Sequence, residues 1–119
     1  MPEILPTVVE TSAFARRAEK LLTVEEYEEL IVYLAQYRES GDEIPGTGGV
    51  RKLRFAAFGR GKSGGVRAIY YFYDKNTPLH AIFLYGKNEQ VDLSPAQKKE
   101  VKAYAATVKA AAIKERSAR

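Results

Sequence analysis

The sequence contains no cysteine, a single histidine and no long apolar run. Without cysteine the chain forms neither a disulfide nor a thiolate metal site, which fits a cytoplasmic protein. One histidine, His80, excludes histidine-clustered zinc and two-histidine acid–base chemistry within one chain. No apolar run approaches the roughly 20 residues of a membrane span, and the first ten residues lack the basic and apolar segments of a signal peptide. We therefore expect a cytoplasmic protein without cofactor, metal or membrane contact.

Acidic residues are also missing from residues 44–73, which contain six cations: Arg51, Lys52, Arg54, Arg60, Lys62 and Arg67. The net charge of +4 conceals this asymmetry, because residues 1–43 sum to −6 (four basic, ten acidic) and residues 44–119 to +10 (fifteen basic, five acidic). A soluble protein usually mixes its surface charges, since a patch of one sign repels itself. The pattern favours a polyanionic partner. The alternative is an ordinary solvated face.

The length of 119 residues and an apolar content of 45% predict one globular domain over residues 1–119. Three β-branched and aromatic runs, separated by glycine and turn residues, predict strands over residues 53–58, 68–73 and 81–85. Residues 4–10 read as a short first strand, which Pro6 confines to a sheet edge or shortens to a start at Thr7. Residues 41–49 form a loop that lacks the lysine and Ser/Thr register of a P-loop, which argues against nucleotide binding.

Three amphipathic stretches predict helices. Thr11 or Ser12 caps the first, which reaches Leu22, and Thr23 with Glu26 has the capping-box spacing that opens the second. The apolar stripe of the second helix is Val24, Tyr27, Leu30, Ile31, Leu34 and Tyr37, and Gly41 is its expected stop. Ser94, Pro95 and Gln97 open the third, with residues 114–119 expected to fray. The order predicts an α+β fold: an N-terminal strand, a helical hairpin on a small, mainly antiparallel sheet, and a C-terminal helix.

The cations of the central strands are placed to converge. Lys52 and Arg54 share parity and therefore a sheet face, whereas Leu53, Phe55 and Ala57 turn to the helices. Arg67 begins the next strand, and Lys87 follows the last one. Long side chains on adjacent antiparallel strands, about 4.8 Å apart, can meet. His80, at opposite parity to Lys87, is expected to have a packing or surface role.

The segments GTGGVRKLR, GGVRAIYYFY and YGKNEQVDLSPAQ, in this order of elements, resemble the RelE-type toxins of bacterial toxin–antitoxin modules, in particular the HigB-like branch. The resemblance covers nearly the whole chain, and the central block is its most specific part. It implies a ribosome-dependent mRNA endonuclease (mRNA interferase) that needs no metal and inhibits translation by cutting mRNA in the ribosomal A site. The implied partners are mRNA, the ribosome (16S ribosomal RNA and the A site of the 30S subunit) and a cognate antitoxin, usually with a helix-turn-helix DNA-binding domain.

The resemblance assigns residues by position. The family's basic pair matches Lys52 and Arg54, its strand-start arginine matches Arg67, and its basic residue at the exit of the last strand falls at Lys87 or at Asn88. The tyrosine that stacks on an mRNA base in some members has no match in residues 89–94, and Tyr71 or Tyr85 could substitute for it. The predicted catalytic residues are thus Lys52, Arg54, Arg67 and Lys87, and the predicted RNA-binding residues are Arg51, Arg60, Lys62, Tyr71, Tyr85 and Asn88.

These residue types suit RNA cleavage, because RNA carries its own nucleophile, the 2′-hydroxyl group. Positioning and charge stabilisation supply most of the remaining catalysis. The planar guanidinium of Arg67 matches two phosphate oxygens, and a lysine packed among arginines loses its proton more readily and could act as base or acid. A second reading stays open: a non-catalytic module that binds RNA, or only an antitoxin, on the same fold.

Overall fold

A computed structural model describes residues 4–59 and 64–118 of the chain. The described elements follow the order β1 (Val8–Glu10), α1 (Ser12–Leu21), α2 (Val24–Gln36), β2 (Asp42–Glu43), β3 (Arg51–Phe55), β4 (Val66–Tyr71), β5 (Leu79–Gly86) and α3 (Pro95–Ser117). The strands form one sheet in the order β1-β5-β4-β3-β2, in which β1 runs parallel to β5 and the other pairs are antiparallel. The predicted α+β architecture, including the edge position of the first strand, is confirmed.

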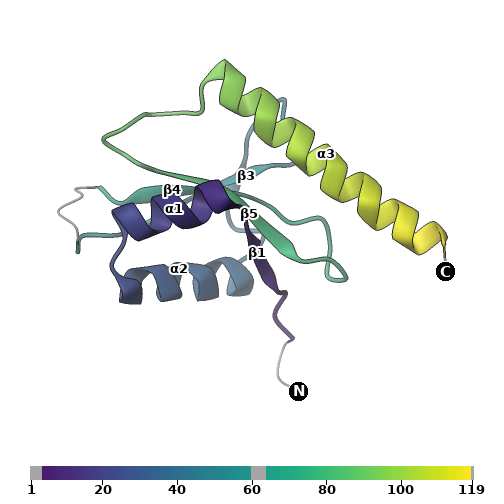
Figure 1. Cartoon of the computed structure of the whole chain (residues 1–119), viewed down its shortest axis with the longest axis horizontal. Helices are drawn as coiled ribbons and strands as arrows, with labels where there is room; N and C mark the ends of the chain where they lie inside the picture. The colour runs from purple at the N-terminus through teal and green to yellow at the C-terminus, as the bar shows by residue number, and fades with distance from the viewer. Residues whose placement is uncertain (1–3, 60–63, 119) are drawn as a thin grey trace.

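The sheet separates two hydrophobic clusters (Figure 1). The first packs α1 and α2 on one face, where Phe14 and Leu34 meet Leu53 and Leu84. The second packs α3 on the other face, through Val101 and Ala105 against residues such as Ile69 and Tyr85. Leu53 and Ala57 lie in the first cluster and Phe55 packs against it, so the predicted alternation along β3 is confirmed.

All three helices begin at the predicted caps. The hydroxyl groups of Thr11, Thr23 and Ser94 each accept a hydrogen bond from the backbone N–H three residues later. In α2 and α3 the residue at that position, Glu26 or Gln97, accepts a hydrogen bond from the cap residue in return. Each such cap stabilises a helix by about 1 kcal/mol. A cap depends only on residues three positions apart, which explains why the helix starts could be predicted correctly from the sequence.

The strands β3 (Arg51–Phe55) and β4 (Val66–Tyr71) each begin two residues earlier than expected. They end three and two residues earlier than expected, respectively. The expectation followed apolar runs, but a strand with one face toward a polar cleft carries charged residues at every second position. The two-residue strand β2 was not expected at all. It lies inside the predicted loop and pairs Asp42 with Lys52, adding an acidic edge to the sheet.

Three expectations about helix α2 and the chain end are wrong. Val24 and Tyr37 were placed in the core stripe of α2, but they are 67% and 52% exposed. The helix ends at Gln36 without help from Gly41, whose backbone N–H instead donates a hydrogen bond to the buried hydroxyl of Tyr70 (3.0 Å). The C-terminal residues do not fray before Ser117, because Arg116 forms an ion pair with Asp74 and lies over the ring of Tyr73.

Glu26 connects the start of α2 to the segment after β3. Its carboxylate accepts hydrogen bonds from the backbone N–H groups of Thr23 (3.0 Å), Phe58 (2.8 Å) and Gly59 (3.1 Å). Partial burial raises the pKa of Glu26, but these hydrogen bonds outweigh it and hold the pKa below its usual value. The charged carboxylate thereby fixes the backbone at Phe58 and Gly59.

Glu26→Gln should lower the free energy of unfolding by about 1 kcal/mol at neutral pH. Because the folded-state pKa is depressed, the contribution is complete above the unfolded pKa and is lost as the pH falls through the folded value. The difference between wild type and variant, measured by urea unfolding from pH 7 to pH 3, should therefore shrink on acidification. Glu25→Gln, on the exposed side of the same helical turn, is the control. A pH-independent difference would contradict this role for the charge.

Candidate functional site

Two arginines face each other across the central strands on the α3 side of the sheet. Arg54 of β3 pairs with Arg67 of β4, and Arg67 pairs in turn with Tyr85 of β5. Residues directly opposite one another in an antiparallel pair share a face, and like charges in such positions are destabilising. This arrangement does not serve the fold. It does provide two adjacent guanidinium groups that an anion could bridge.

Lys52 lies on the same face, two residues before Arg54. The two side chains line a cavity of about 350 Å³ together with Tyr85 of β5, Asp92 of the β5–α3 loop and Lys98 of α3. Within this cavity the Nζ atom of Lys52 lies 3.0 Å from a carboxylate oxygen of Asp92. That hydrogen bond holds the pKa of the exposed Asp92 carboxyl below its usual value. The cavity therefore contains a neutralised pair beside the exposed Arg54.

Lys87 reaches the same end of the sheet by way of Gly64. Its backbone N–H donates to the carbonyl of Gly65 (3.2 Å), and its side chain lies against Gly64, where an added Cβ would come within 2.4 Å of Lys87 Cδ. The guanidinium of Arg67 donates to the carbonyl of the same Gly64 (3.1 Å). The structure thus brings the side chains of Arg67 and Lys87 together at Gly64. The pairing of β3 with β4 places Arg54 beside Arg67. We refer to Lys52, Arg54, Arg67 and Lys87 as the cation cluster.

Neither predicted stacking tyrosine offers a free ring face. Tyr85 lies beneath the cation cluster, fully buried, and its hydroxyl donates to the carbonyl of Val91 (3.3 Å). Burial raises its pKa, although Lys52 and Arg67 oppose the shift. Tyr71 is buried at the far end of β4, opposite His80 and away from the cluster. A ring packed inside the second hydrophobic cluster cannot stack on a base, so the premise on which Tyr71 and Tyr85 were chosen is wrong.

The other predicted RNA-binding residues are scattered. Arg51 is turned to the opposite face of β3, where its guanidinium donates to the carbonyls of Glu39 (3.0 Å) and Gly41 (2.7 Å) and lies 3.6 Å from Glu43, which is a structural role. Asn88 is exposed in the turn directly after Lys87. Arg60 and Lys62 lie outside the described residues.

The acid-free stretch of sequence does not form an acid-free surface. Asp42 and Glu43 of β2 and Asp92 of the β5–α3 loop line the cavity with Lys52 and Arg54. Asp92 is forty positions from Lys52, and Asp42 and Glu43 lie just before the acid-free stretch, where the unexpected strand β2 pairs them with β3. Charge counting along the chain therefore missed all three. Lys98, in the first turn of α3, was missed for the same reason. The sequence did contain a signal for Asp92, because the resemblance had already directed attention to residues 89–94 after β5.

His80 has the packing role expected of it. Its Nδ1 atom lies 2.8 Å from the hydroxyl of Tyr104 on α3, and burial lowers its pKa. Over the described parts of the chain, no three histidine, aspartate or glutamate residues come together in a way that could hold a metal ion. Nor is any helix within residues 4–59 and 64–118 both long and apolar enough to cross a membrane.

Comparison with known proteins identifies the family to which this chain belongs. The model of the RelE toxin of the RelE/RelB toxin–antitoxin system matches residues 7–117, nearly the whole chain. The chain belongs to the RelE toxin family. An arginine-to-alanine double mutant of the E. coli toxin RelE, solved in the free state, is 15% identical and shares the fold with a TM-score of 0.52 over 73% of this chain and 88% of that one. The resemblance to RelE-type toxins that the sequence indicated is therefore confirmed at the level of the family.

Membership makes this RelE-family chain a toxin of a toxin–antitoxin system, a class known for endoribonuclease activity, with an antitoxin as partner and translation as target. The match covers the cation cluster and the helices on both faces of the sheet alike.

Proposed function

We propose that this RelE-family protein is a cytoplasmic, ribosome-dependent mRNA interferase, close to the HigB-like branch, which cuts mRNA in the ribosomal A site without a metal ion. The observation that carries the proposal is the pairing of Arg54 with Arg67 on one sheet face, with Lys52 on the same face and Lys87 at Gly64. Such a set neutralises a phosphate that gains charge during the reaction. The proposed antitoxin carries a helix-turn-helix DNA-binding domain.

The chemistry uses the 2′-hydroxyl group of the RNA. This oxygen attacks the adjacent phosphorus, its proton passes to a base, and the bond from phosphorus to the 5′ oxygen breaks as that oxygen gains a proton. The products are a 2′,3′-cyclic phosphate and a 5′-hydroxyl end. We assign the phosphorane charge to Arg67 and Arg54, whose forks fit phosphate oxygens in pairs. Lys52 and Lys87 are the candidates for proton transfer and further charge stabilisation.

The ion pair between Lys52 and Asp92 is the reason why we propose that cleavage depends on the ribosome. In the free protein the lysine is held by a carboxylate, and the buried Tyr85 offers no stacking surface to an incoming base. An mRNA phosphate fixed by the ribosome would have to compete with Asp92 for Lys52. A short, flexible RNA loses conformational entropy when it is ordered without the ribosome, and therefore competes poorly with Asp92 for Lys52.

A second function, a non-catalytic RNA- or antitoxin-binding module, is favoured by the same burial of Tyr71 and Tyr85. Controlled expression in a bacterial host separates the two readings. The mRNA interferase should arrest growth on induction, and co-expression of the adjacent gene should restore growth. A folded protein that leaves growth unchanged in cells lacking the adjacent gene would support the binding module instead.

A further inference from the structure

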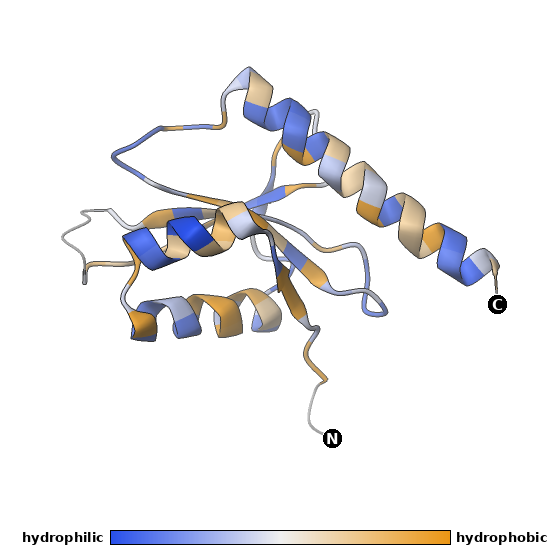
Figure 2. Ribbon diagram, viewed as in Figure 1, coloured by the Kyte–Doolittle hydropathy of each residue, from blue (hydrophilic) through white to orange (hydrophobic). Residues whose placement is uncertain are grey.

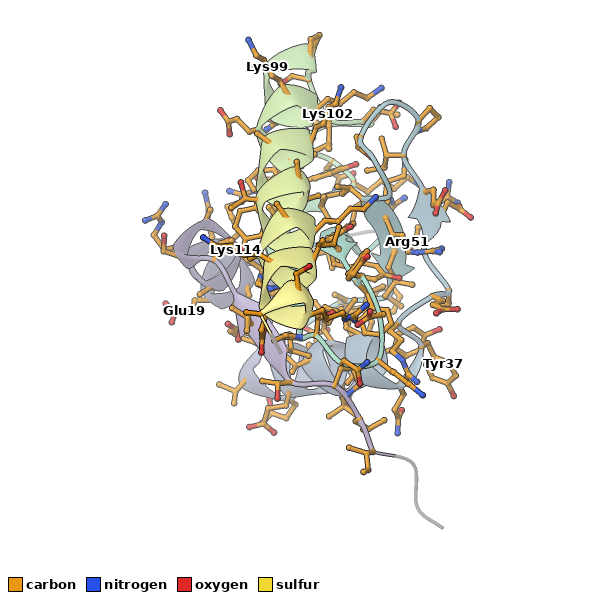
Figure 3. All side chains as sticks on the ribbon, turned by 90° about the vertical axis from the view of Figure 1, so that its right-hand side faces the viewer. Glu19, Tyr37, Arg51, Lys99, Lys102 and Lys114 are labelled. Atoms are coloured by element: carbon orange, nitrogen blue, oxygen red, sulfur yellow. The ribbon has the colours of Figure 1, made fainter. Side chains whose placement is uncertain are left out.

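The outer face of α2 has no role in the proposed cleavage chemistry. Six side chains at helical spacing border a shallow hollow of about 430 Å³ on it: Glu25, Glu28, Glu29, Val32, Tyr33 and Gln36. Val24 (67% exposed) and Tyr37 (52%) extend this face at its two ends, and Val32 (50%) lies within it. Helix α2 contains no lysine or arginine. Figure 2 shows hydrophobic and hydrophilic segments alternating along this helix, and Figure 3 shows Tyr37 at the periphery of the molecule.

We propose that the outer face of α2 is a docking surface for a basic, arginine-containing segment of another protein. The face is divided along its length: the three carboxylates follow Val24 in its N-terminal half, and Val32, Tyr33 and Tyr37 lie in its C-terminal half. An apolar helix residue normally packs on a core, yet Val24 and Val32 belong to neither hydrophobic cluster and are 67% and 50% exposed. A partner that places cations beside the carboxylates and apolar side chains beside Val32 and Tyr33 would complement both halves.

The tyrosines favour arginine over lysine in the partner. The rings of Tyr33 and Tyr37 lie 4.6 Å apart at 41°, and Tyr33 is held from the other side by Phe55, whose ring centroid is 6.3 Å away. Glu29 precedes Tyr33 by four residues and therefore lies one turn before it on the same face. A guanidinium group can stack on a tyrosine ring while its fork bonds a carboxylate, which a lysine ammonium cannot do with the same geometry.

Other occupants fit less well. Nucleic acid and anionic lipid are repelled by three carboxylates without an intervening cation. In a second copy of this chain, basic side chains such as Lys99, Lys102 and Lys114 lie on α3, as Figure 3 shows. Because α2 and α3 lie on opposite faces of the sheet, an α2–α3 contact between copies would be heterologous and would not close into a dimer. One helix face also buries less than a standard interface, so the complex should be transient and sensitive to salt.

The test uses three fluorescein-labelled synthetic amphipathic helical peptides of one design, with arginine, lysine or glutamate at the charged positions. Fluorescence anisotropy with the full chain should give a dissociation constant on the order of tens of micromolar for the arginine peptide, weaker binding for the lysine peptide and none for the glutamate peptide. Neutralising Glu25, Glu28 and Glu29 to glutamine should weaken arginine-peptide binding about tenfold, and Tyr33→Ser with Tyr37→Ser should remove the preference for arginine.

The matched control is Lys99→Gln with Lys102→Gln on α3, which should leave peptide binding unchanged, with circular dichroism confirming that every variant is folded. Unchanged arginine-peptide binding by both α2 variants would overturn the proposal. So would concentration-dependent self-association, measured by sedimentation equilibrium, that the α2 variants abolish, because the occupant would then be a second copy. Loss of RNA binding in the glutamine variant would assign the face to nucleic acid and overturn it as well.

Discussion

Arg67→Ala is expected to lower mRNA cleavage by about 100- to 1,000-fold, the usual loss when a donor to a developing negative charge is removed. Arg67 occupies the centre of the proposed site, because it pairs with Arg54 on one side and shares Gly64 with Lys87 on the other. Its described hydrogen bonds go only to the carbonyls of Gly64 and Val66, so its removal should cost the fold little. In-vitro translation followed by primer extension measures the rate, and circular dichroism checks the fold.

Companion variants separate charge from geometry. Arg67→Lys keeps the charge but loses the planar fork, and should retain only part of the activity. Lys52→Ala, Arg54→Ala and Lys87→Ala should each reduce cleavage. Arg16→Ala, an exposed arginine on α1 whose removal changes the net charge equally, is the control. A folded Arg67→Ala protein that cuts mRNA at the wild-type rate would show that the site is assigned to the wrong residues.

Gly65→Ala is expected to produce the second large effect, a loss of about 2 to 4 kcal/mol in the free energy of unfolding. Gly65 has a φ of +76°, and a Cβ added to it would lie 2.2 Å from the backbone carbonyl oxygen of Phe55. The collision is with backbone, so β3 and β4 would have to separate just where they position Arg54 and Arg67. Urea unfolding measures the change, and cleavage should fall with the folded fraction.

Gly48→Ala is the matched control for this prediction. Gly48 has nearly the same φ, +74°, but no atom lies within 4 Å of the position of an added Cβ. Its substitution should therefore lower the free energy of unfolding by only about 1 kcal/mol, because alanine disfavours the left-handed backbone conformation. Equal destabilisation by the two substitutions would mean that the close approach of Gly65 to Phe55 has no energetic weight.

The sequence was most informative where structure depends on neighbours along the chain. The caps at Thr11, Thr23 and Ser94 each need a partner only three residues away, and the shared face of Lys52 and Arg54 needs only the two-residue period of a strand. These features are visible in the sequence and are confirmed in the structure. Strand starts were harder, because β3 begins with Arg51 and Lys52, which are charged residues that an apolar pattern leaves out.

The composition of the site depends on contacts between distant residues. Asp92 meets Lys52 across forty positions, and β2 brings Asp42 to the same cavity, so a stretch without acids became a cavity with three carboxylates. The burial of Tyr71 and Tyr85 likewise follows from the packing of α3, which lies far along the chain. The sequence alone could not show that a helix covers this face of the sheet.

The proposed dependence on the ribosome is tested most directly by mapping 5′ ends on one transcript, incubated with the purified protein either bare or during translation. Each arm uses the same protein concentration and salt, with Arg67→Ala as the blank. Cuts at fixed positions within codons of the translated message, and little cleavage of the bare transcript, are the predicted result. Equally efficient cutting of the bare transcript, or cuts without codon phase in the translated one, would contradict the account.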